Sequence, residues 1–187
     1  MPVHDTEACY VPNMGIKDFM IAPIDLSFLY QDIEDTPVPI SLCIKQLGEF
    51  TPIQMTKVPP ASRHWCIVWQ VKRIFGKPET STQAFRALHI VRERDRSGMP
   101  CRHLTNWGPM TKVYASDMIE KSRFIQLGSV GLEKRRRLEE IARSMKVKVP
   151  DGGWNSQDWI MSVLRMAVQE RVLDVDLEAV RRLALQP

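Results

Sequence analysis

Proline is distributed very unevenly along this chain of 187 residues. Proline fixes φ and lacks the N–H that a helix or a sheet ladder needs, so long helices are not expected where it is frequent. We therefore expect residues 1–60 to form extended, wrapping segments, with one strand at Val38–Leu47 and a break at Pro59-Pro60. This part holds eight of the thirteen prolines: Pro2, Pro12, Pro23, Pro37, Pro39, Pro52, Pro59 and Pro60.

The charges are as unevenly placed as the prolines. Residues 1–60 carry 3 Lys/Arg against 8 Asp/Glu, and the rest of the chain carries 23 against 14. Two oppositely charged surfaces within one domain would explain this asymmetry. A basic face for an anionic partner such as RNA, phosphate or an acidic lipid would explain it as well, with Arg135, Arg136 and Arg137 as its candidates. Helical i,i+4 pairing of this run with neighbouring glutamates is the alternative.

Composition narrows the class of protein. Hydrophobic residues make up 44% and charged residues 26%, as in globular domains. No apolar run approaches the ~18 residues that span a bilayer, and no signal pattern opens the chain, so we expect no membrane span and a cytoplasmic location. The four cysteines stand far apart without a C-x-x-C pair, so neither a metal nor a cofactor is expected.

The middle of the chain has the composition of strands. His64–Ile74 and Thr82–Glu93 are rich in aromatic and β-branched residues, and the Gly/Pro-containing stretch Phe75–Ser81 lies between them. This pattern predicts an antiparallel hairpin. Shorter strands are expected around Met110–Ala115 and Arg123–Leu127.

The last third of the chain has helical periodicity. Helices are expected at Gly131–Met145, from the N-cap Asn155 to about Leu173, and at Asp176–Leu185. Strands followed by helices predict an α+β fold, an antiparallel sheet with C-terminal helices. Residues 1–60 would wrap the α+β body, 61–187, within one structural domain.

Two short stretches have residue types suited to catalysis. Arg63–Val68 (RHWCIV) begins a predicted strand with a histidine, and Trp154–Ile160 (WNSQDWI) begins a predicted helix. A helix N-terminus offers unpaired N–H groups and a positive dipole end, which favour a developing anion. A nucleophile there with an imidazole nearby is the arrangement that acyl transfer uses.

These stretches resemble the circularly permuted papain-like enzymes of the lecithin:retinol acyltransferase and NlpC type, in which a His-Trp strand precedes an Asn-Cys-(Glu/Gln)-x-(Phe/Trp) helix start. They are also similar to a group of fungal proteins that end in a comparable Asn-Cys-Gln-x-Trp helix. The resemblance covers residues 63–93 and 150–172 and implies a permuted papain-like layout. It implies that His64 is the general base and that Ser156 occupies the nucleophile position.

Other residues would complete such a site. Folding the hairpin brings the region of His89 to Glu93 opposite His64, and either of these two side chains could orient its imidazole. Asn155 and Gln157 are candidates for binding an oxyanion or substrate, although Asn155 could act only as a helix cap. Trp65 and Trp107 are candidate pocket residues, although a strand tryptophan such as Trp65 also suits the core.

The chain departs from the resemblance at the nucleophile, because it has serine where the family has cysteine. A serine hydroxyl is a far weaker acid than a thiol, so a proton must be removed during attack. A working serine variant, a scaffold that has lost catalysis and an engineered Cys-to-Ser change all fit the sequence.

The expected function is acyl or aminoacyl transfer from an ester, thioester or amide in a fungal-type small-molecule pathway, with a small molecule or an acyl-carrier or aminoacyl substrate as partner. The alternatives are a non-catalytic binding module on the same scaffold and a pericyclase- or isomerase-like protein that shapes a reactive intermediate.

Overall fold

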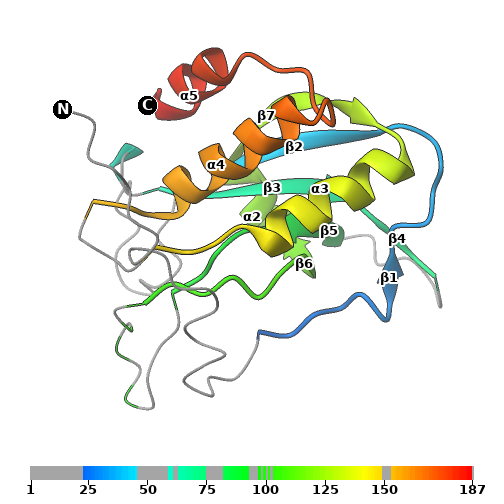
Figure 1. The fold of residues 1–187 in the computed structure, drawn as a ribbon. Coiled ribbons are helices and arrows are strands. Elements are labelled where there is room, and N and C mark those ends of the chain that lie inside the picture. Colours follow the sequence, from blue (N-terminus) through cyan, green and yellow to red (C-terminus); the bar gives the residue numbers. More distant parts are fainter. Residues whose placement is uncertain are drawn as a thin grey trace.

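The computed structural model describes residues 23–45, 59–60, 63–74, 82–92, 97, 99, 101, 103–148 and 153–186. It has the expected α+β architecture, with a five-stranded antiparallel sheet in the order β6-β5-β3-β2-β7 and a two-stranded sheet of β1 and β4 (Figure 1). The strands are β1 Tyr30–Gln31, β2 Val38–Lys45, β3 His64–Gln70, β4 Lys72–Arg73, β5 Thr82–Leu88, β6 Met110–Ala115 and β7 Ser122–Val130. The helices are α2 Ser116–Glu120, α3 Leu132–Ser144, α4 Ser156–Gln169 and α5 Leu177–Leu185.

The predicted hairpin is confirmed. β3 and β5 pair antiparallel, with Ile67 opposite Leu88, and both strands are shorter than expected. The strand is interrupted at Val71. The next strand, β4, leaves the main sheet and pairs with β1. The predicted wrapping segment therefore supplies both a strand for the small sheet and the strand β2 of the main sheet.

Pro39 lies in β2, between β3 and β7, where a proline is not expected. The pairing explains how it fits. β2 pairs with β7 from Val38 onward, but it pairs with β3 only from Ser41, and a register shift separates Ile40 from Ser41. At Pro39, β2 thus has no hydrogen-bonded neighbour on the side of β3. The missing N–H of the proline therefore costs no hydrogen bond to β3.

Helices α3 and α4 cover one face of the main sheet (Figure 1). Alternate residues of β3, among them Trp65, Ile67 and Trp69, face these helices and are at most 1% exposed. In α4 the buried stripe consists of Trp159, Ile160, Val163, Leu164 and Ala167. Met166 of the same helix is 39% exposed and lies outside this stripe.

The opposite face of the sheet is concave. It carries a second core cluster, formed by Cys43, Cys66, Val68, Phe85, Ala87 and Tyr114. Phe85 of β5 and Phe124 of β7 are three strand spacings apart, roughly 14 Å in a flat sheet, yet their ring centroids lie 6.1 Å apart. The two outer parts of the sheet must therefore curl toward each other on this side, which we call the concave face.

The connection between β6 and β7 leads to the same conclusion. These strands form the opposite edges of the main sheet, roughly 19 Å apart if the sheet were flat. Residues 116–121 alone join them, and five of these six residues form α2. A helix rises only ~1.5 Å per residue, so this short connection reaches across only because the sheet is strongly coiled.

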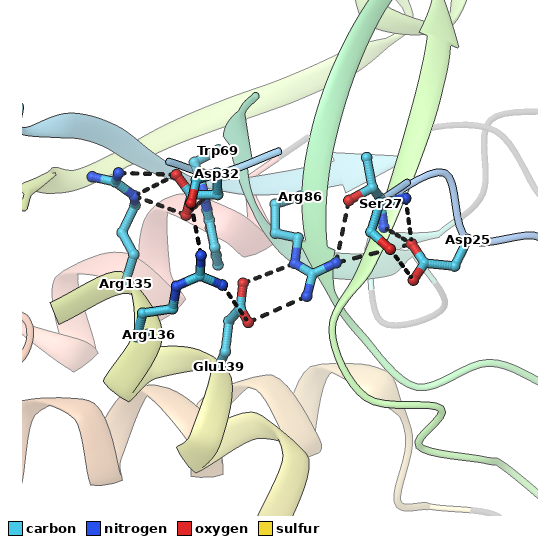
Figure 2. Close-up of polar contacts among 9 residues, drawn as sticks. Asp25, Ser27, Asp32, Trp69, Arg86, Arg135, Arg136 and Glu139 are labelled. Atoms are coloured by element: carbon cyan, nitrogen blue, oxygen red, sulfur yellow. Dashed lines mark hydrogen bonds and ion pairs between the residues drawn. The ribbon is translucent and has the colours of Figure 1, made fainter. Parts of the chain in front are cut away.

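The segment of residues 25–36 is fastened to the body by a polar network (Figure 2). Arg135 of α3 donates through Nε to both carboxylate oxygens of Asp32 at 3.0 Å, and Trp69 Nε1 donates to Asp32 at 2.9 Å. Farther along, Arg86 of β5 pairs with Glu139 of α3 at 2.8 Å. Asp25 accepts the Thr111 backbone N–H at 2.7 Å. Two buried ion pairs, Arg135–Asp32 and Arg86–Glu139, thus join the N-terminal segment to α3 and α3 to β5, and Asp25 adds a hydrogen bond to β6.

Candidate functional site

The hairpin brings two predicted site residues into direct contact. His64 opens β3, and His89 directly follows β5. His64 Nε2 lies 3.0 Å from His89 Nδ1, and the two rings meet edge to face with their centroids 5.2 Å apart. Of the two candidates for orienting His64, His89 is therefore in place. Glu93, the other candidate, lies outside the described residues.

His89 is buried and uncharged. It is 3% exposed, and burial lowers its pKa well below the usual value of 6.5. The nearby charges of Lys112, His64 and Lys45 lower the pKa further. Its Nε2 is buried and has no hydrogen-bond partner among the described residues. Nδ1 of a neutral imidazole in this position can accept a hydrogen bond from His64 Nε2–H and so fix the orientation of the His64 ring.

The side chain of His64 belongs to the concave face. His64 is paired directly with Lys45 across β2 and β3, and directly opposed side chains share a face. Lys45 Nζ lies 5.3 Å from the ring centroid of Tyr114, a member of the concave cluster. Half-buried His64 therefore lies among cationic and aromatic side chains, on the face away from α3 and α4.

One side chain at the start of α4, that of Gln157, contacts the backbone just before His64. Gln157 Nε2 donates to the backbone oxygens of Arg63 at 3.0 Å and Pro60 at 2.7 Å. The two predicted catalytic stretches thus meet in space, although they are about ninety residues apart. The Gln157 amide N–H groups are used in these two hydrogen bonds, so they do not form the predicted oxyanion site.

The other predicted residues of α4 serve the helix itself. Asn155 is the N-cap, because its side chain accepts from the Gln157 backbone N–H at 2.7 Å while its own N–H donates to Asp158 at 3.0 Å. Ser156 is buried, and the described residues show no hydrogen bond between its hydroxyl and His64. Strand alternation explains this, since α4 packs on the face that His64 points away from.

The structure corrects two other expectations. Trp65 is 1% exposed and lies in the core beneath the helices, so it does not line a binding surface. Arg135 is fully buried against Asp32 and is therefore not part of a basic face. Arg136 remains about half exposed but donates to the backbone oxygen of Asp32, and Arg137 pairs with Glu140 and Glu170. Trp107 is half-buried in the loop before β6.

Sequence reasoning missed the other polar groups of the concave face. Lys45 comes from β2, and Lys112 and Tyr114 come from β6. Only the register of the strands places the two lysines near His89. The alternation Ser41, Cys43, Lys45 along β2 was the available signal. Cys43 and Cys66 are paired across the strands and are buried, and the contact with Cys66 together with burial raises the pKa of the Cys43 thiol. Cys43 is thus a neutral packing group and a poor nucleophile.

Comparison with protein-family models, curated proteins and solved structures gives no match for this chain. Within the described residues, no group of three or more His, Cys, Asp or Glu side chains is arranged to hold a metal ion. The helices in the described part of the chain are all too short or too polar to cross a membrane.

Proposed function

We propose that this protein is an acyl-transfer enzyme in which His64 is the general base and His89 its positioning residue. The observation that carries this proposal is the 3.0 Å contact between His64 Nε2 and His89 Nδ1, with His89 buried and its pKa lowered. When His64 takes up a proton at Nδ1, its Nε2–H donates to His89. A buried neutral acceptor keeps that orientation throughout the cycle.

The proposed reaction is a direct transfer to the acceptor. His64 removes the proton from an acceptor hydroxyl or amine, whose electron pair attacks the acyl carbonyl carbon of an ester, thioester or amide. The charge that develops on the carbonyl oxygen would be stabilised by the ammonium groups of Lys45 and Lys112. Both are close enough to His89 for their positive charges to lower its pKa. Collapse expels the leaving group, which receives the proton from His64. Water in place of the acceptor gives hydrolysis.

A second candidate mechanism passes through an acyl-enzyme on Ser156. It is favoured by the hydrogen bond between Gln157 and the backbone oxygen of Arg63, which brings the start of α4 next to the residue before His64. Because α4 packs on the face of the sheet that His64 points away from, this mechanism needs the Ser156 hydroxyl to move within reach of the imidazole.

Hydrolysis of p-nitrophenyl acetate separates the two mechanisms. Under direct transfer, His64→Ala should lower the protein-catalysed rate by about 10²–10⁴-fold, whereas Ser156→Ala and the control His103→Ala should leave it unchanged. Under the second mechanism, Ser156→Ala should abolish it, and an acetylated Ser156 should be visible by intact mass. A rate that survives His64→Ala in a folded variant would contradict both.

The role of His89 is tested by rescue. His89→Phe removes the acceptor for His64 Nε2–H and should lower the rate and shift its pH profile. His89→Gln retains an acceptor and should restore part of the rate. If both variants fold and behave alike, His89 is only a packing residue.

A further inference from the structure

We infer that a cavity at the other end of the concave face is a binding site for a small, uncharged molecule with an aromatic ring. The cavity has a volume of about 410 Å³, within the range of small-molecule sites. It lies beside Gln70, at the end of β3 opposite His64 and roughly 20 Å along the strand from it. This inference is independent of the proposed acyl transfer.

The floor of the cavity is aromatic and apolar. Phe85 and Phe124 lie there with their rings 25° from parallel, and Val68 packs beside them. Phe85 also stacks on Tyr114 at 5.4 Å, so its ring is held in place from behind. A row of fixed ring faces favours a flat ring as the occupant, because offset stacking adds to the burial of apolar area.

One wall of the cavity is held in place by hydrogen bonds, of which those to Asp32 are drawn in Figure 2. Residues Asp32, Glu34 and Thr36 line one side, and Arg135 of α3 bonds to all three: to the Asp32 carboxylate and to the backbone oxygens of Glu34 and Thr36. Trp69, also a lining residue, donates to the same Asp32 carboxylate. A wall fixed in this way is present before a ligand arrives, which reduces the ordering that binding requires.

The charges around the cavity favour a neutral ligand. Each of its two carboxylates already has a cation: Asp32 is paired with Arg135, and Glu34 with Lys72. A charged ligand would compete with these pairs. At the mouth, the Ser41 hydroxyl and the Gln31 and Gln70 amides can hydrogen-bond polar substituents of the ligand.

The test uses N-phenyl-1-naphthylamine, a neutral aromatic probe that fluoresces in apolar sites. Wild-type protein should bind it saturably with one site per chain, and the anionic 8-anilinonaphthalene-1-sulfonate should bind at least about tenfold more weakly. Gln70→Trp fills the mouth of the cavity and should weaken binding of the neutral probe at least about tenfold. Gln83→Trp, at an exposed strand position outside the cavity lining, is the matched control and should bind as the wild type does.

Several results would overturn the inference: no saturable binding by the wild type, equal affinity of Gln70→Trp and Gln83→Trp, or tighter binding of the anionic probe. If Gln70→Trp does not fold, judged by circular dichroism, Ser41→Leu at another lining position replaces it with the same expected loss. The p-nitrophenyl acetate activity of Gln70→Trp should stay at the wild-type level, because His64 lies at the far end of the strand.

Discussion

Replacing Arg135 by methionine should destabilise this protein more than any other single change on α3. The guanidinium is fully buried and donates to the Asp32 carboxylate and to three backbone oxygens, including that of Val130 at 2.7 Å. Methionine keeps most of the apolar volume but leaves Asp32 buried, where, among the residues that the structure describes, its carboxylate keeps the hydrogen bond from the Trp69 side chain. Breaking one side of a buried ion pair costs about 3–5 kcal/mol. For a chain of this length, that loss corresponds to a fall in Tm of about 6–20 °C.

Urea unfolding followed by circular dichroism measures this loss directly. Arg137→Met is the matched control, because it removes the same side chain from the same helix where the ion pairs are exposed. Its effect should be far smaller. In the double variant Asp32→Leu/Arg135→Met, no charge is left orphaned, so it should be more stable than Arg135→Met alone. If Arg135→Met is as stable as Arg137→Met, or if the double variant is less stable than the single one, the buried pair does not anchor residues 32–36.

Two further predictions concern stability. Burial lowers the pKa of His89, so below its usual value of 6.5 the unfolded chain binds a proton that the native state excludes. The free energy of unfolding should then fall with decreasing pH by up to about 1.4 kcal/mol per pH unit more than in His89→Gln; equal slopes in urea titrations between about pH 5 and pH 7.5 would contradict this. Asn155→Ala should cost about 1 kcal/mol through loss of the cap, whereas Asn155→Asp, which keeps a capping oxygen, should stay near the wild type.

The main-sheet strands and the C-terminal helices could be predicted from local patterns. β6 occupies the expected Met110–Ala115, and α3, α4 and α5 begin within a residue of their expected starts. Each has a local signal, such as the cap at Asn155 or the alternation of β-branched residues. Proline was a less reliable guide, because its effect at Pro39 depends on where the neighbouring strand begins to pair.

The basic run of α3 shows what local patterns leave out. A row of Lys and Arg on a helix indicates a solvated face, and most of this run is indeed exposed. Arg135 is the exception, because its partner Asp32 lies 103 positions earlier in the chain. No spacing rule connects two residues so far apart, so only the tertiary structure distinguishes the buried arginine from its neighbours.

The candidate site shows the same limit in a different form. The pairing of β3 with β5 brings His89 next to His64, so this contact could be predicted. The relation of His64 to Ser156 depends instead on which face of the sheet α4 covers, and a one-residue change in strand register would reverse the answer. The structure puts α4 against Trp65 and its neighbours, while His64 faces Lys45 and Tyr114.

The coiling of the sheet links the histidine pair to the cavity. α2 joins the two edge strands within six residues, so the strands curl around one concave face. Phe85 stacks on both Phe124 and Tyr114 on that face, and the two phenylalanines also line the cavity. One end holds His64, His89 and two lysines; the other holds an aromatic cavity with balanced charge. A single curled sheet thus presents a polar end suited to proton transfer and an apolar end suited to holding a neutral ring.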